Sequence, residues 1–225
     1  TLELVAVAAC LVLCIAIPLG VYAGAYPKRA SSKLIMSGSI LGISLPSFWV
    51  GMMMIYIFAV VLRLLPASGR GNTVMVGNVA LSIFAPGGIR YVILPAITLA
   101  LTNVATMLRL TRSGILENMR QDYIKFARAK GVPAKSILFG HALKNALIPV
   151  VTIFGMDLGN MIAFTTITET IFAWPGMGKL LIDAINKSDR PIIVAYLMAA
   201  ACMFVVLNFI VDILYTLIDP RIELR

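Results

Sequence analysis

The stretch DYIKFARAKGVPAKSILFGHALKNALIPV, residues Asp122 to Val150, differs from the sequence on either side of it. It carries five Lys or Arg residues and the only His of the chain, and a Gly-Val-Pro break interrupts it at residues 131–133. The whole chain is 60% hydrophobic and only 13% charged, with a mean hydropathy of +0.95. Because an average soluble domain has roughly 25% charged residues, this composition predicts a polytopic membrane protein.

Apolar runs long enough to cross a membrane surround this stretch. About 20 apolar residues span a bilayer core as a helix. Prolines within such runs are tolerated, since groups on neighbouring helices can satisfy the carbonyls that a proline frees. We therefore expect an all-α bundle with kinks at Pro18, Pro46 and Pro95. Its five predicted spans are residues 2–26, 34–65, 92–110, 146–173 and 192–218.

The distribution of Lys and Arg predicts the orientation of the bundle. Thirteen lie on one side of the predicted membrane, within residues 27–33, 109–144 and 219–225, and six lie on the other, within 63–90 and 179–190. The side richer in cations is expected to be cytoplasmic. The chain should then start outside the membrane and end in the cytosol, with the stretch 122–150 on the cytoplasmic side.

The basic stretch itself predicts a short helix, a sharp turn and a second helix. Asp122 is a plausible N-cap for a helix over 122–130, and Gly131 can adopt the left-handed conformation that ends it. Pro133 suits the first turn of the helix that follows. The first helix has a face at helical spacing, made of Tyr123, Phe126, Ala127 and Lys130.

Three interpretations of this amphipathic helix are open from the residues alone. It could lie on the membrane surface with its cations against anionic headgroups. It could dock into a groove of a soluble partner through Tyr123 and Phe126. A nucleic-acid contact is a remote third, because no aromatic stacking platform is interleaved with the charge.

The stretch resembles the cytoplasmic loop of ABC importer permeases that carries an E-A-A-x-x-x-G pattern. Gly131 matches the glycine of that pattern and Ala127 matches its second alanine. Lys125 and Phe126 stand where the general pattern has Glu and Ala, and permeases of the dipeptide, oligopeptide and nickel importers typically carry a basic residue there. Further similarities to these permeases are HALKNALIPVVT at 141–152, RLTRSGILE at 109–117, TETIFAWPGMGKLLIDAI at 168–185 and NFIVDILYTLIDPRI at 208–222.

The resemblance implies one transmembrane permease domain over 1–225, with the type I ABC importer fold and a location in the bacterial or archaeal inner membrane. Such permeases usually have another span and a large external segment near the N-terminus, so we expect a further piece before Thr1. The implied partners are a second homologous permease, two ATP-binding subunits that hold ATP and Mg, an external solute-binding protein, and membrane lipid. The solute stays open among peptides, nickel chelates, opines and sugar conjugates, since the solute-binding protein largely selects it.

In this family, the loop implied at 117–145 fits into a cleft of the ATP-hydrolysing subunit and couples its closure to the spans. Such coupling is a rigid-body movement between packed elements, and Gly131 is its expected corner. The coupling residues implied by the resemblance are Tyr123, Lys125, Phe126, Ala127, Arg128, Ala129, Lys130 and Gly131.

The sequence itself predicts that ATP is hydrolysed elsewhere. A phosphate-binding loop requires Gly-x-x-x-x-Gly-Lys followed by Ser or Thr, and GMGKL at Gly176 to Leu180 shares only the Gly-Lys. No nucleophile and base set, and no metal-spaced His cluster, suggests another enzymatic activity. We therefore expect a subunit without catalytic residues, metal ligands or cofactors of its own.

Asp157 is the ionisable residue nearest the middle of a predicted span, and an intramembrane charge is costly unless it is paired or faces water. Gly155 and Gly159 flank it and would allow close helix approach. Asp157 and Asn160 are candidates for the translocation pathway. The alternative for Asp157 is an internal carboxyl that is hydrogen-bonded or protonated.

Residues 174–191 predict a turn and a short external helix with Leu180, Leu181, Ala184 and Ile185 on one side. Such a helix could lie flat on the membrane, while the resemblance implies an external lid over the passage. The lid candidates are Trp174, Pro175, Gly176, Gly178 and Asp183. We expect Glu169, at the outer end of the preceding span, to cap or pair at the interface.

A rival function from another class is a stand-alone secondary transporter or channel, in which the intramembrane acids would carry coupling ions. Co-purification with ATPase subunits would favour the importer, and proton- or sodium-driven uptake by this chain alone would favour the rival.

Overall fold

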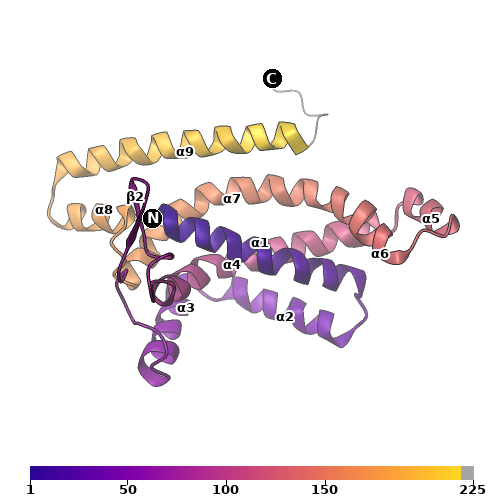
Figure 1. Ribbon diagram of the computed structural model, residues 1–225, viewed down its shortest axis with the longest axis horizontal. Helices are drawn as coiled ribbons and strands as arrows, with labels where there is room; N and C mark the ends of the chain where they lie inside the picture. Colours follow the sequence, from indigo (N-terminus) through magenta and orange to yellow (C-terminus); the bar gives the residue numbers. More distant parts are fainter. Residues whose placement is uncertain (219–225) are drawn as a thin grey trace. The chain divides into compact units, whose positions relative to one another are not determined.

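The computed structural model describes residues 1–218 and is mostly helical (Figure 1). Arg221 and Arg225, which contributed to the predicted orientation, and the end of the motif at 208–222 lie outside the described residues. The long helices are α1 (Leu2–Ala25), α4 (Ile89–Asn118), α7 (Leu143–Ile171) and α9 (Arg190–Ile218). The chain forms two compact units, and each of these helices contributes one end to each unit. The first unit contains residues 1–11, 45–101 and 158–207, and the second contains residues 12–44, 102–157 and those from 208 onward.

Three helical segments of the described chain are long and apolar enough to cross a membrane: α1, α4 and residues 134–171. They coincide with the first, third and fourth predicted spans. The last segment contains α6 (Ala134–Ser136), the π-helix η2 (Ile137–Ala142) and α7. The fifth predicted span, residues 192–218, lies within the single helix α9.

The second predicted span, residues 34–65, is not one helix. It is divided into α2 (Ala30–Ser44) and the continuous pair α3 (Ser47–Met54) and η1 (Ile55–Val61), with a bend of 105° between them. Pro46 precedes the first residue of α3 with an extended backbone, at φ −60° and ψ 134°. A residue before proline is disfavoured in the α region, so the chain leaves the helix at this point. Pro18 and Pro95, in contrast, lie inside uninterrupted helices.

The first unit also contains a β-hairpin, which the sequence analysis did not predict. Strands β1 (Val74–Val76) and β2 (Val79–Leu81) pair antiparallel, with Val76 opposite Val79. Gly77 and Asn78 form the two-residue turn, with Gly77 at φ +62°, and positive φ at this position suits the twist of a tight hairpin. The base of the hairpin is attached to α1, because the carboxylate of Glu3 accepts hydrogen bonds from Arg70 at 2.7 Å and from the backbone N–H of Ile83 at 2.9 Å.

In the second unit, helices approach closely through glycines. A Cβ on Gly20 of α1 would lie 2.6 Å from Cβ of Thr111 on α4, and one on Gly24 would lie 2.7 Å from Cβ of Ile115. Two glycines four residues apart leave this room on one helix face. Between α4 and α7, Gly114 makes a similar contact with Ala146, where a Cβ would lie 3.0 Å from the Ala146 Cβ. The core of this unit therefore has little space for larger side chains.

Candidate functional site

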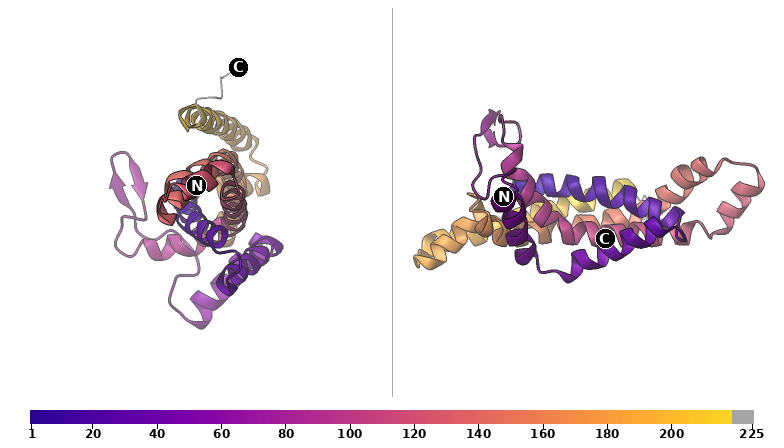
Figure 2. Two further views of the ribbon diagram at one scale, coloured as in Figure 1. Left: turned by 90° about the vertical axis from the view of Figure 1, so that its right-hand side faces the viewer. Right: turned by 90° about the horizontal axis from the view of Figure 1, so that it is seen from below.

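The predicted cytoplasmic loop contains α5 (Asp122–Ala129), which extends beyond the ends of α4 and α7 in the second unit (Figure 2). Its N-cap is Gln121, not Asp122 as predicted, and Asp122 lies in the first turn. The carboxylate of Asp122 accepts a hydrogen bond from Nζ of Lys125 at 2.8 Å, and this bond and the positive charge of Lys125 lower the pKa of Asp122. Both side chains are exposed, so this pair adds little stability.

Gly131 ends α5 as predicted. It lies at φ +78°, and its N–H donates to the carbonyl of Arg128 at 2.9 Å. The N–H of Val132 donates to the carbonyl of Ala127 at 3.1 Å, which completes the two-bond pattern of a Schellman ending. A Cβ on Gly131 would meet nothing within 4 Å. The glycine is therefore required for its backbone conformation and not for space. Pro133 follows as the N-cap of α6, one residue before the predicted position in its first turn.

The two faces of α5 have different surroundings. Ile124 is fully buried among Ile115, Ile137 and other residues of the second unit's core. Ala127, one turn later, packs at the edge of the same cluster. On the other side, Phe126 is 61% exposed, with Nζ of Lys130 lying 4.4 Å from its ring centroid. The helix is thus held by Ile124 and presents Phe126 outward.

Tyr123 is an exposed aromatic residue whose hydroxyl also makes hydrogen bonds within the chain. It is 40% exposed. Its hydroxyl donates to Oδ1 of Asn118, at the end of α4, at 2.8 Å and accepts from Nδ2 of Asn145, at the start of α7, at 3.0 Å. Asn118 in turn donates to the carbonyl of Gly114 at 2.9 Å. Tyr123 therefore joins α5 to both neighbouring helices.

Of the eight predicted coupling residues, all are exposed except Ala127, which is partly buried. Ile124, Asn118 and Asn145 were not among the predicted site residues. Ile124 could have been found from the sequence, since it lies three residues before Ala127 and is the one aliphatic residue of α5 larger than alanine. Asn118 and Asn145 gave no such signal. Asn145 is 22 residues from Tyr123, and Asn118, although only five residues away, lies on a different helix.

The predicted lid begins with a buried turn in the first unit. Phe172 and Trp174 are each 1% exposed, and the Arg70 guanidinium lies 5.6 Å from the Trp174 ring centroid. Ala173 between them is at φ +45°. After Pro175, Gly176 is the N-cap of α8 (Met177–Asn186).

Glu169 caps this lid helix, as expected. Its side chain is fully buried, and its carboxylate accepts a hydrogen bond from the backbone N–H of Lys179, in the first turn of α8, at 2.9 Å. A carboxylate is favourable at a helix N-terminus. The glycines of the motif make room here: a Cβ on Gly176 would lie 2.0 Å from Oε1 of Glu169, and one on Gly178 would lie 2.3 Å from Oγ1 of Thr166.

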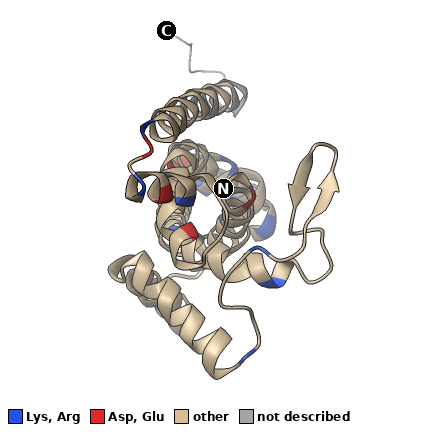
Figure 3. Cartoon of the chain, turned by 90° about the vertical axis from the view of Figure 1, so that its left-hand side faces the viewer, with Lys and Arg blue, Asp and Glu red and all other residues tan. Residues whose placement is uncertain are grey.

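α8 is amphipathic, as predicted, and its apolar side is only partly covered within the first unit. Ala184 is buried, but Leu180 and Ile185 are each 50% exposed. Asp183 is exposed as well, and it lines an open hollow of about 500 Å³ with Thr1, Pro175 and Lys179. Acidic and basic residues both occur along α8 and the turn before α9 (Figure 3). The lid helix is therefore fixed at its start by Glu169, while Leu180, Asp183 and Ile185 are exposed along its length.

Asp157 and Asn160 lie one helical turn apart in α7. Asp157 is partly buried and takes part in an interaction, and Asn160 is exposed. Next to them, Gly159 is buried, and a Cβ there would lie 2.6 Å from the Phe204 ring of α9. The predicted close helix approach is confirmed at Gly159, while the role of Asp157 in a passage stays a prediction.

Comparison with known proteins identifies the family. Residues 16–224 match the family described as binding-protein-dependent transport system inner membrane component. The chain belongs to this family. Within it, the chain is 42% identical over 201 residues to the di/tripeptide transport system permease protein DppB of Pseudomonas aeruginosa, covering 84% of this chain and 60% of that protein. It is 41% identical over 223 residues to the oligopeptide transport system permease protein AppB of Bacillus subtilis, covering 99% of this chain and 69% of that protein.

A solved relative confirms the fold class. A chain of the MetNI methionine ABC transporter, from a study of its inward-facing conformations, superimposes with a TM-score of 0.71 at 14% identity, covering 96% of this chain and 93% of that one. This member of the binding-protein-dependent permease family therefore has the transmembrane fold of type I ABC importers. As a family member, it is an integral inner-membrane permease component.

Proposed function

We propose that this chain is the permease subunit of an ATP-driven importer and forms half of a passage for a peptide-like solute. The named relatives are peptide permeases, and the solute proposed for this chain follows from that similarity. The proposal also includes a second homologous permease, two ATP-binding subunits that hold ATP and Mg, and an external solute-binding protein.

The observation that carries the proposal is the arrangement of α5. Its inward side is fixed by the buried Ile124 and by the hydrogen bonds of Tyr123 to α4 and α7. Its outward side presents Phe126, Lys125 and Lys130 without cover. A short helix attached rigidly to two spans, with a free aromatic at its surface, suits a helix-in-groove contact with an energy-supplying subunit.

In this proposal, closure of the ATP-binding subunits moves α5, and α5 moves the ends of α4 and α7. The movement reaches both spans because Tyr123 bonds to a residue of each. Packed helices shift as rigid bodies between discrete arrangements and do not deform continuously. In this proposal, one arrangement of the spans opens the passage to one side of the membrane and the other arrangement opens it to the opposite side. Asp157, Asn160 and the lid residues 174–183 are proposed to line and cover that passage.

The test is co-purification of this chain with its ATP-binding subunits. Phe126→Asp should weaken the complex by about 30-fold, since removal of an aromatic hot spot costs about 2 kcal/mol. Phe84→Asp is the matched control, because Phe84 is 64% exposed against 61% for Phe126 and lies in the first unit. It should leave the complex intact.

An unchanged complex in Phe126→Asp would contradict the docking role of α5. Proton- or sodium-driven uptake by this chain alone, in vesicles without ATP-binding subunits, would instead support a secondary transporter.

A further inference from the structure

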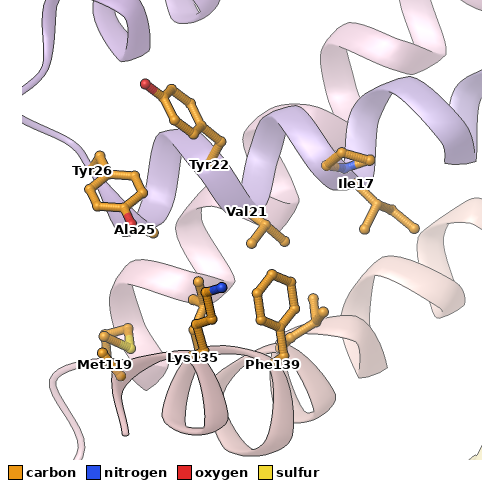
Figure 4. Close-up of a pocket in the computed structure, with 12 residues that line it drawn as sticks. Ile17, Val21, Tyr22, Ala25, Tyr26, Met119, Lys135 and Phe139 are labelled. Atoms are coloured by element: carbon orange, nitrogen blue, oxygen red, sulfur yellow. The ribbon is translucent and has the colours of Figure 1, made fainter.

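The second unit contains an apolar hollow of about 460 Å³ that the proposed coupling function does not use. Its walls come from the end of α1, the end of α4 and the segment from α6 to α7. Figure 4 shows Lys135 and Phe139 projecting toward Val21 of α1 across this hollow. Most of the lining is apolar, and it includes Ile17, Val21, Met119, Leu138, Phe139 and Leu143.

The polar residues of the lining are Lys135, Tyr22 and Tyr26. No ion pair involves Lys135 in the part of the chain that the structure describes. A second cation adjoins the hollow, because the Arg29 guanidinium lies 4.3 Å from the ring centroid of Tyr26. The lining contains no acidic residue. The hollow therefore combines an apolar wall with positive charge that is not neutralised by its lining.

Two aromatic side chains that line the hollow are exposed, which suggests that another molecule covers them. Phe139 is 58% exposed and Tyr26 is 46% exposed. Burial of such apolar surface is favourable, and the adjoining cations select a partner with negative charge. A free phosphate would gain nothing from the apolar wall, and a purely apolar molecule would gain nothing from Lys135. A phospholipid supplies both an acyl chain and a phosphate.

We propose that this hollow binds a phospholipid with an anionic headgroup. The acyl chain lies between Val21 and Phe139, and Lys135 donates hydrogen bonds to the phosphate while Arg29 adds positive charge at the rim. The inference rests on the proposed orientation, which puts the hollow in the cytoplasmic leaflet. Anionic lipids are found there, and basic pockets between helices bind their headgroups.

The test uses native mass spectrometry of the assembled transporter, purified with either phosphatidylglycerol or phosphatidylcholine added. The unmodified complex should retain phosphatidylglycerol in preference. Lys135→Gln and Arg29→Gln should each reduce that preference by about fivefold, the effect of one cation near an anionic surface. Lys144→Gln is the matched control, since Lys144 is an exposed cation next to Leu143 but does not line the hollow. Equal retention of both lipids by the unmodified complex, or an equal effect of the control, would overturn the proposal.

A second variant tests the apolar part of the site. Ala25→Phe fills the hollow and should reduce retention of both lipids to a similar extent, whereas Lys135→Gln should reduce that of phosphatidylglycerol more than that of phosphatidylcholine, whose phosphate charge is offset by its own choline cation. The same spectrum shows whether the complex is still assembled, so a folding defect is recognised directly. Unchanged retention in an assembled Ala25→Phe complex would contradict the predicted seat of the acyl chain.

Two further outcomes would also overturn the proposal. Displacement of the lipid by excess inorganic phosphate would show that the cations bind phosphate without the apolar wall. Retention by the isolated chain but not by the assembled transporter would show that a protein subunit covers the hollow. Neither readout depends on ATP hydrolysis or uptake, so failure of the lipid site is distinguishable from failure of the proposed permease function.

Discussion

Single side chains decide how the loop between α4 and α7 is built. Gly131 supplies a backbone conformation, Ile124 supplies burial, and Tyr123 supplies hydrogen bonds to two helices. Phe126 does none of these and is left exposed. The residues that hold α5 are therefore different from the residue that is free to contact a partner.

Replacement of Gly131 tests the turn after α5. Valine at φ +78° is strained, at a cost of about 1–2 kcal/mol, which shifts a two-state equilibrium by about 5- to 30-fold. We expect Gly131→Val to weaken assembly or to lower the uptake per ATP hydrolysed in reconstituted vesicles. Gly131→Asn should be milder, because asparagine tolerates this conformation better.

Gly140→Ala is the control for that experiment. Gly140 lies in the helical segment η2, and a Cβ there also meets nothing within 4 Å. It should leave coupling unchanged. Full transport by Gly131→Val would contradict the role of this corner.

Replacement of Tyr123 separates positioning from docking. Tyr123→Phe keeps the aromatic ring and removes the bonds to Asn118 and Asn145, each worth about 0.5–1.5 kcal/mol. Hydrogen exchange of the α5 amides should become faster, while the amount of co-purified ATP-binding subunit changes little. The same change in an Asn145→Ala background should have a smaller effect, since the two residues share one bond. Fully additive effects would show that this bond does not hold α5.

At the scale of elements, the packing of helices depends on residues of two helices together. In the second unit, α1 and α4 approach each other closely because Gly20 and Gly24 lie on one face of α1. In the first unit, α8 begins where it does because a buried carboxylate from α7 caps it. Both features need small residues at fixed positions.

Gly20→Ala tests the pairing of α1 with α4. Its Cβ would lie 2.6 Å from a Thr111 carbon and 2.8 Å from the Leu108 carbonyl oxygen, and overpacking of this kind costs about 1–3 kcal/mol. The midpoint of thermal unfolding in detergent should fall. Gly38→Ala in α2 is the control, because nothing lies within 4 Å of its Cβ, and alanine is the better helix former. A decrease of equal size in both variants would exclude close packing as the cause.

The distribution of charge along the entire chain predicts its topology. In a variant without Cys10, Cys14 and Cys202, a membrane-impermeant maleimide should label Asn78→Cys in intact cells. The same reagent should label Lys125→Cys only in inside-out vesicles. This result is expected because the side richer in Lys and Arg stays in the cytosol. Labelling of Lys125→Cys from outside would contradict both the orientation and the docking of α5 to a cytoplasmic subunit.

The sequence alone determined the membrane class, four of the helical segments at the predicted spans, the end of α5 at Gly131 and the family. These follow from local properties: apolar length, charge and the conformational freedom of glycine. The tertiary structure decided that Ile124 is buried while Phe126 is exposed, that the bend expected at Pro46 reaches 105°, and that the helix capped by Glu169 is α8. Periodicity shows that a helix has two faces, but the face that is covered depends on partners far away in the chain. A buried carboxylate or tyrosine hydroxyl likewise needs hydrogen bonds that only folding brings within reach.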